Sequence, residues 1–169
     1  MLVFNGTHFT ECAKQDTTGT YIAWLLSPRS AQEIHEWAKY NGITDLVPTT
    51  EIHATIMYAP KDEVETSIHG DHPLPMPVEI NHHNQPKTRI LGKVGEAGAL
   101  VTTYDSDILN RRHFQYQDMG LRHAQETFLP HITLSYDASA QCPKVMQRMM
   151  RVPCELPVIF DRERVTFAR

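Results

Sequence analysis

The sequence predicts an α+β fold in which two pseudo-symmetric strand–helix–strand lobes lie around a central cleft. The first observation behind this prediction is a duplicated six-residue pattern, His53–Tyr58 and His131–Tyr136, in which both copies read His, apolar, Thr, apolar, any residue, Tyr. The second is the similar length of the unit before each copy. Tyr21 lies 53 − 21 = 32 residues before His53, and Leu100 lies 131 − 100 = 31 residues before His131. We therefore expect two related lobes that share one cleft.

The first lobe opens with Thr20–Leu26, a run of apolar and aromatic residues that is typical of a strand. Ser30–Glu33 then matches a capping box, which predicts that a helix starts there with Ile34, Trp37 and Ala38 on its inner face. Asn41–Gly42 predicts the end of that helix, because glycine adopts the left-handed conformation in which many helices terminate. The first motif copy then supplies the second strand of the lobe.

The second lobe repeats this order of elements. Ala99–Tyr104 predicts a strand, and Asp105–Ser106 is a plausible cap for a helix that passes through Leu109, Tyr116 and Met119 and stops at Gly120. The second motif copy follows as a strand. The terminal stretches Cys154–Phe160 and Arg162–Phe167 then predict one or two closing strands, whose charges we expect to be solvated.

A linker rich in histidine and proline separates the lobes, and we expect it to be mostly loop. One strand is predicted in it, around Val78–Ile80 and continuing towards Thr88–Leu91. The whole chain, residues 1–169, is then a single domain, with lobe 1 at about 18–60, the linker at about 61–86 and lobe 2 at about 87–169.

Composition limits the partners that the protein can have. Hydrophobic residues make up 41% of the chain and charged residues 21%, as in an ordinary globular domain. A net charge of −4 argues against binding to long nucleic acid, which favours a basic face, although a small phosphorylated substrate remains compatible. No stretch approaches the roughly 18 apolar residues of a membrane span, and Met1–Gly6 lacks the features of a signal peptide. We expect a cytoplasmic protein without a membrane partner.

The motif residues themselves indicate acid–base chemistry on phosphate. Side chains alternate between the faces of a strand, so each copy places its His and Thr on one face, and its apolar residues and final tyrosine, Tyr58 or Tyr136, on the other. Two imidazoles with pKa values near 6.5 can act as base and acid at neutral pH, and two hydroxyls can donate hydrogen bonds to phosphate oxygens. This chemistry fits an RNA-type phosphodiester and needs no metal and no cofactor.

Two further histidine patterns are interpreted as non-functional. His8–Thr10 is a third His-x-Thr match, but it lacks the apolar alternation of a half-buried strand and is expected to be a chance match. His69–His72 carries two histidines and an aspartate, which is half of a binuclear zinc hydrolase motif. The position that would hold a further histidine is Ser67, so a histidine-rich surface loop without metal is the favoured interpretation.

At the duplicated motif the chain resembles the two-histidine (2H) phosphoesterase superfamily, which is defined by paired His–apolar–Thr motifs in a bilobal α+β fold. Within the superfamily, four parts of the sequence look most like the phage anti-CBASS phosphodiesterase family: Thr18–Tyr21, Trp37, Glu51–Tyr58 and Phe128–Tyr136. That family degrades the cyclic oligonucleotide messengers, such as cyclic GMP-AMP and cyclic tri-adenylate, with which bacteria trigger anti-phage death. The resemblance implies a cyclic di- or trinucleotide as the substrate.

The resemblance also implies roles for individual residues. One His and one Thr from each motif would be catalytic, the histidines as acid and base and the threonines as phosphate donors: His53, Thr55, His131 and Thr133. Tyr21 would be a base-stacking residue at the cleft. The C-terminal tail of the family helps to close over the nucleotide, and Glu163 and Phe167 are the candidates for that role in this sequence.

Three other functions remain open at this level. The first is a different 2H enzyme, an RNA-end cyclic phosphodiesterase or a 2′-5′ RNA ligase, which the acidic balance of the chain disfavours. The second is a non-catalytic sponge for cyclic nucleotides, which would need hydrogen-bond donors but no pair of titrating histidines. The third is a zinc hydrolase that uses the histidine-rich loop.

Overall fold

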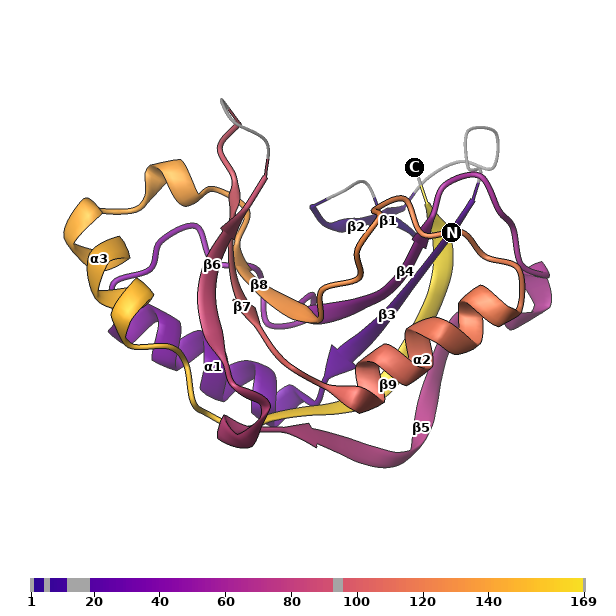
Figure 1. The fold of residues 1–169 in the computed structure, drawn as a ribbon, viewed down its shortest axis with the longest axis horizontal. Coiled ribbons are helices and arrows are strands. Elements are labelled where there is room, and N and C mark those ends of the chain that lie inside the picture. The colour runs from indigo at the N-terminus through magenta and orange to yellow at the C-terminus, as the bar shows by residue number, and fades with distance from the viewer. Residues whose placement is uncertain (1, 5–6, 12–18, 93–95, 169) are drawn as a thin grey trace.

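The structure is a computed structural model that describes residues 2–4, 7–11, 19–92 and 96–168, so Thr18 lies outside the described residues. Within these ranges one sheet runs in the order β2-β1-β9-β3-β4-β8-β7-β6, and β5 pairs with β9 beside this path. The strands are β1 Leu2–Phe4, β2 Phe9–Glu11, β3 Thr20–Leu26, β4 His53–Ala59, β5 Gly70–Ile80, β6 Lys87–Leu91, β7 Ala99–Thr103, β8 His131–Ser135 and β9 Val158–Ala168. The helices are α1 Pro28–Tyr40, α2 Asp107–Asp118 and α3 Pro143–Arg151, with short 3-10 turns at Thr66–Ile68, His82–Asn84 and Ala138–Ala140. In Figure 1 the two halves of the sheet diverge from the place where β4 meets β8.

The two predicted lobes are present as β3–α1–β4 and β7–α2–β8, which confirms the fold class. Their strand pairs have the same register, because Ala23 is opposite Thr55 in the first lobe and Val101 is opposite Thr133 in the second. Equivalent residues are separated by a constant offset, since 101 − 23 = 78 and 133 − 55 = 78. The duplication therefore extends from the motifs to the hydrogen-bonded partner strands.

Both motif strands also contain a β-bulge at the same position. The ladder skips Ile56 in β4 and Leu134 in β8, the residue after each motif threonine. Because one extra residue reverses the alternation, the tyrosine that ends each motif returns to the face of the His and Thr. Tyr58 lies opposite Tyr21, with ring centroids 6.1 Å apart, and the hydroxyl of Tyr136 hydrogen-bonds to the motif threonine of its own strand. The prediction that Tyr58 and Tyr136 point to the opposite face is therefore wrong.

The main hydrophobic core lies on the sheet face away from the motif histidines, where the helices pack. It joins the inner residues of the strands to those of the helices, among them Ile22, Trp24, Ile34, Ala54, Ile56, Leu109, Ile132 and Phe160. A smaller cluster lies on the motif face and consists of Phe4, Phe9, Tyr21, Ala23, Leu25 and Ala168. No helix of the described residues is long and apolar enough to cross a membrane.

The start of α1 differs from the prediction, while α2 starts and ends as predicted. The N-cap of α1 is Ser27, whose Oγ accepts a hydrogen bond from the amide of Ser30, and a proline occupies the first helical position. Ser30 is thus inside the helix, where its buried hydroxyl accepts from the amide of Ile159 and ties α1 to β9. In α2, Ser106 caps Leu109 as expected.

The linker is more regular than the predicted loop, because its middle part, Gly70–Ile80, forms the edge strand β5. Prolines 73, 75 and 77 lie in this strand, which is possible because an edge strand has one side that needs no backbone donors. Pairing with β9 is interrupted between Pro73 and Val78. The predicted strand at Val78–Ile80 is the end of β5, and it does not continue into β6, because Gln85 takes a left-handed conformation with φ 50° between them.

The terminal segment forms one long strand, β9, inside the sheet between β1 and β3, and one of its charges is buried. Glu163 is 6% exposed, and its carboxylate accepts hydrogen bonds from Arg112 at 2.6 and 2.8 Å, from Tyr116 at 2.6 Å and from the indole of Trp24 at 2.8 Å. Burial alone would raise the pKa of Glu163, but the hydrogen bonds from these three side chains lower it below its ordinary value. The expectation of solvated charges is therefore wrong for Glu163.

We expect Glu163→Ala to lower the free energy of unfolding by about 3 kcal/mol, because the variant leaves Arg112 without its carboxylate. That estimate is at the lower end for a buried ion pair, since the Arg112 side chain is 33% exposed. Urea denaturation at pH 7 measures the change. The control is Glu33→Ala, which removes an exposed pair with Arg29 on α1 and should change stability little. Equal effects of the two substitutions would contradict the prediction.

Candidate active site

The four motif side chains come together where the two lobes meet. β4 and β8 pair antiparallel with Ala54 opposite Ile132, and these are the middle residues of the two His-x-Thr triplets. Antiparallel pairing through this point places His53 opposite Thr133 and Thr55 opposite His131. All four side chains therefore lie on the same face of the sheet. One imidazole and one hydroxyl from each lobe therefore lie around a local twofold axis, on the sheet face opposite the main hydrophobic core.

Both imidazoles are oriented by the same contact. Nδ1 of His53 lies 2.6 Å from the carbonyl oxygen of Glu51, and Nδ1 of His131 lies 2.6 Å from the carbonyl oxygen of Leu129. A carbonyl oxygen only accepts, so Nδ1 is the protonated nitrogen in both rings. Nε2 is then the nitrogen of each ring that is able to accept or release a proton.

The first lobe adds a hydrogen-bonded tyrosine to this arrangement. The hydroxyl of Tyr21 lies 2.8 Å from Nε2 of His53 and 2.5 Å from Oγ1 of Thr55. Because Nε2 of the neutral ring accepts, Tyr21 donates to His53 and in turn accepts from Thr55. The counterpart of Tyr21 in the second lobe is Ala99, since 99 − 21 = 78, and not Leu100 as the sequence comparison assumed. The two halves of the site therefore differ at this position.

The ring of Tyr21 is placed differently from its expected position at an open cleft. It is 1% exposed, and one face stacks on Phe4, with centroids 4.1 Å apart and planes 15° from parallel. A nucleobase can stack on that face only after Phe4 leaves it. Base stacking by Tyr21 stays a prediction, and its observed contact is the hydroxyl bridge between His53 and Thr55.

The surroundings favour the neutral form of both histidines. The pKa of His53 is lowered to about 4, mainly by burial and to a smaller extent by the charges of His131 and Arg164, while the hydrogen bond to Glu51 opposes the shift. Burial also lowers the pKa of His131, against the opposing effect of its hydrogen bond to Leu129. Each ring therefore starts neutral at pH 7 in the free protein.

We expect kcat/KM to follow a bell-shaped pH curve whose maximum lies below pH 6.5, the ordinary histidine value. The reactive form has one protonated and one neutral imidazole, and it is most populated between the two apparent pKa values, both of which are lowered. Activity should thus fall as pH rises above 6.5, because the acid loses its proton. Initial rates from pH 4 to 9 test this, and a continued rise to pH 8 would contradict it.

Two further histidines, which the sequence did not single out, hold the bulge of β4. Nδ1 of His113 donates to the carbonyl oxygen of Ile56 at 2.7 Å, and the amide of Tyr58 donates to Nδ1 of His123 at 3.1 Å. The ring of His113 also stacks on Phe128, 4.0 Å between centroids and 3° from parallel. Neither histidine lies in a motif, and helix α2 and the loop before β8 bring them to the strand only through the tertiary fold. We identify them as positioning residues for Thr55 and Tyr58.

The bulge of the second lobe is held by backbone instead. The carbonyl oxygen of Leu134, the counterpart of Ile56, accepts from the amide of Val47 at 2.9 Å. The same local geometry is therefore supported by titratable rings in one lobe and by a peptide group in the other.

The structure does not bring Glu163 and Phe167 to the four motif residues. Glu163 pairs opposite Trp24 and Phe167 opposite Thr20, which places both on the helix-covered face. Phe167 contacts the ring of His69 edge-on at 4.1 Å. Arg164 is one of the β9 side chains on the motif face: it lies opposite Ala23, and its charge lowers the pKa of His53.

The histidine-rich segment is engaged in contacts within the protein. The carboxylate of Asp71 accepts from Arg164 at 2.6 and 2.8 Å, and Nε2 of His72 donates to the carbonyl oxygen of Ile68 at 2.7 Å. No group of three or more potential metal-ligating side chains occurs in the part of the chain that the structure describes.

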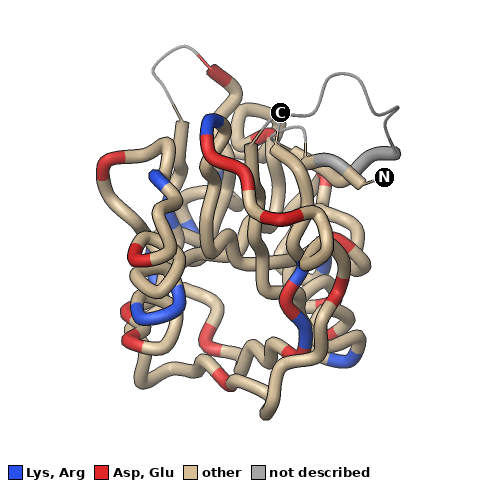
Figure 2. The backbone as a smooth tube through the Cα atoms, turned by 90° about the vertical axis from the view of Figure 1, so that its right-hand side faces the viewer, with Lys and Arg blue, Asp and Glu red and all other residues tan. Residues whose placement is uncertain are grey.

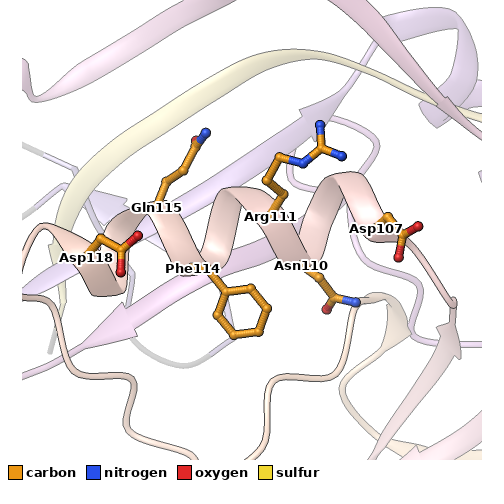
Figure 3. A pocket seen from close by; sticks show the side chains of 6 residues that line it. All are labelled: Asp107, Asn110, Arg111, Phe114, Gln115 and Asp118. Atoms are coloured by element: carbon orange, nitrogen blue, oxygen red, sulfur yellow. The ribbon is translucent and has the colours of Figure 1, made fainter.

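Charged residues of both signs are distributed over the part of the chain that the structure describes. Figure 2 shows acidic and basic residues interspersed along the described backbone. Two hollows lie away from the motif residues. One, of about 640 Å³, is bounded by β5, α2 and β9 beside the ion pair of Arg112 and Glu163. The other, of about 420 Å³, lies on the outer face of α2, and its lining comes from that helix alone (Figure 3): Asp107, Asn110, Arg111, Phe114, Gln115 and Asp118.

The fold and the paired His-x-Thr strands define a 2H phosphoesterase. A solved structure described as a phosphoesterase shares the fold, with a TM-score of 0.53 over 90% of this chain and 88% of that chain at 13% identity. Residues 18–166 match the family model of anti-CBASS protein Acb1, and the chain belongs to that family. Its residues 1–17, which include β1 and β2, lie outside the match.

Relatives of the family come from phages and bacteria. The chain is 27% identical to anti-CBASS protein Acb1 of Enterobacteria phage T4 over 150 residues, which cover 85% of this chain and 93% of that protein. It is 28% identical to the protein of the same name from Salmonella phage S16, over 87% of this chain and 86% of that protein. A third Acb1, from Sphingomonas paeninsulae, is 32% identical over 111 residues, and the chain spans 18% of its length.

Proposed function

We propose that this protein cleaves the 3′-5′ linkages of cyclic oligonucleotide second messengers, such as cyclic GMP-AMP and cyclic tri-adenylate, and thereby counters bacterial CBASS immunity. The observation that carries the proposal is the twofold arrangement of His53, Thr55, His131 and Thr133 at the seam between β4 and β8, in a member of the anti-CBASS protein Acb1 family. Each half of that arrangement provides one imidazole and one hydroxyl, as cleavage of a phosphodiester requires.

The reaction follows from these groups. Nε2 of one neutral histidine removes the proton of the ribose 2′-hydroxyl, whose oxygen attacks the adjacent phosphorus. The bond from phosphorus to the 5′-oxygen breaks, and the second histidine, protonated, gives its proton to that oxygen. The product is a linear oligonucleotide with a 2′,3′-cyclic phosphate, which water then opens. The hydroxyls of Thr55 and Thr133 donate to the non-bridging oxygens, where negative charge develops.

The charge of the protein supports a compact substrate. A net charge of −4 and interspersed charges give no extended basic surface for many phosphates of a nucleic-acid chain. A cyclic dinucleotide carries two phosphates, and each has a 2′-hydroxyl beside it. Internal attack then needs only correct positioning of one linkage at the seam.

Turnover is expected to survive excess EDTA, because the proton transfers are assigned to imidazoles of the chain. The assay incubates the EDTA-treated protein with cyclic GMP-AMP, cyclic tri-adenylate and an RNA that ends in a 2′,3′-cyclic phosphate, and identifies the products by mass spectrometry. Linear products from the cyclic oligonucleotides support the proposal. Opening of the RNA end alone would indicate an RNA-processing enzyme, tight binding without product a sponge, and activity restored by added zinc a metal hydrolase.

A further inference from the structure

The N-terminal strands cover one half of the candidate active site. β1 pairs antiparallel with β2, and it runs parallel to the end of β9 with Phe4 opposite Ala168. Both strands belong to residues 1–17, which the family model does not match. Their side chains Phe4 and Phe9 belong to the smaller cluster on the motif face of lobe 1.

Two phenylalanines of these strands pack on the motif side chains. The ring of Phe4 stacks on Tyr21 at 4.1 Å, and the rings of Phe4 and Phe9 each contact the imidazole of His53 with centroids 5.4 Å apart. The guanidinium of Arg164 lies over Phe9, 4.6 Å from the ring centroid. As a result, His53 is 7% exposed and Tyr21 is 1% exposed.

This packing conflicts with the reaction proposed above. Nε2 of His53 has to reach a ribose hydroxyl or a leaving oxygen, but it is occupied by the hydroxyl of Tyr21 beneath the two phenylalanine rings. The contact of Phe4 with Tyr21 also has the near-parallel geometry of a nucleobase stacked on an aromatic side chain. Phe4 thus takes the place that a base of the substrate would occupy.

We propose that β1 and β2 form an autoinhibitory strap, in which Phe4 occupies the base-stacking face of Tyr21 and has to leave before a nucleotide binds. This inference rests on the proposed function. The strap is suited to release, because β1 and β2 have three residues each and short terminal strands open at low cost. Since only the open form binds, the apparent affinity for substrate is reduced by the fraction of protein that is open.

Substitutions in the full chain test the strap. Phe4→Ala and Phe9→Ala should each lower KM for cyclic GMP-AMP by roughly 10-fold with little change in kcat, as expected when a competing closed state is removed. The same variants should speed the modification of His53 by diethyl pyrocarbonate, followed by mass spectrometry. Tyr40→Ala, which removes an aromatic ring that is 91% exposed at the end of α1, is the control and should change neither quantity.

The two readouts separate this inference from the proposed function. Faster labelling of His53 without turnover of any cyclic oligonucleotide would overturn the proposed function. It would still support the inference that β1 and β2 cover His53. Turnover with an unchanged or higher KM in both variants would overturn the strap, because the phenylalanines would then support the site.

A measurement on the unaltered protein does not depend on how the variants fold. Hydrogen exchange of the amides in β1 and β2 is compared with and without the 2′-deoxy analogue of cyclic GMP-AMP, which binds but lacks the attacking hydroxyl. Faster exchange with the analogue supports displacement of the strap. Slower exchange would overturn the proposal, because the strands would then close on the nucleotide.

Discussion

Replacing either motif histidine by alanine is expected to lower kcat by roughly 10² to 10⁴, the range for loss of one general acid or base. His53 and His131 present Nε2 from opposite lobes, and each is fixed through Nδ1 by a backbone carbonyl, so neither can take over the role of the other. Single-turnover rates with cyclic GMP-AMP measure the effect on the chemical step. Thr55→Ala and Thr133→Ala should cost less, because each removes one hydrogen bond to the phosphate but no proton transfer.

The controls for these variants are histidines outside the seam. His8→Ala removes the histidine of the third His-x-Thr match, which is exposed beside β2, and His83→Ala removes an exposed histidine after β5. Both should retain nearly the activity of the unaltered protein. If His8→Ala were as damaging as His53→Ala, the assignment of catalysis to the paired strands would fail.

Removal of the attacking hydroxyl from the substrate is expected to abolish cleavage. In a cyclic dinucleotide with hydrogen in place of each 2′-hydroxyl, the internal nucleophile is lost together with its proximity to phosphorus, which is worth far more than any single side chain. We expect a rate below about 10⁻³ of that for the ribose form. Incubation of both compounds with the protein, followed by chromatography of the products, measures the ratio.

Binding of the same analogue is the control for this experiment. The analogue keeps its phosphates and bases, so it should compete with the ribose substrate at a similar concentration. Efficient cutting of the deoxy compound would show that water, not the 2′-hydroxyl, attacks phosphorus, and the roles given to the two histidines would have to be revised.

The lobes and the four motif residues could be predicted because their signals are local and occur twice. Apolar runs predict β3 and β7, caps at Ser106 and Gly120 predict α2, and the duplicated motif predicts two strands that face one cleft. The sequence implied that the two motif strands are related by a twofold axis, but it did not show which residues are opposite each other. The structure shows this through the pairing of Ala54 with Ile132. Local patterns were sufficient here because each element follows its own propensity.

The features that the sequence did not predict depend on contacts between distant segments. The residues Ile56–Tyr58 show no sequence pattern that predicts a bulge. Simple alternation of side chains therefore assigned Tyr58 to the wrong face of the sheet. His113 and His123 act through backbone groups of β4 that are more than 50 residues earlier in the chain. The sequence predicted Glu163 to be a solvated surface charge, because its partner Arg112 is distant in the chain and contacts it only in the folded protein.

Proline content and short length concealed the two remaining elements. Local rules predict a loop for Pro73–Pro77, and only the place of β5 at an edge of the sheet makes a strand possible. β1 and β2 are too short for periodicity to be recognised, and His8–Thr10 was set aside for lack of alternation. Phe9 and Thr10 of that segment form β2 together with Glu11, and the ring of Phe9 contacts the imidazole of His53.

The twofold relation between the motif strands has a consequence for the direction in which a linkage is held. A phosphodiester linkage has a direction, with an attacking 2′-oxygen on one side of phosphorus and a leaving 5′-oxygen on the other. The four motif residues, in contrast, have local twofold symmetry and present the same groups to both sides of phosphorus. Turning the linkage by half a turn exchanges the base and the acid and leaves the chemistry intact. Orientation is therefore decided outside the motifs, where the lobes differ, and one such difference is that Tyr21 of the first lobe corresponds to Ala99 in the second.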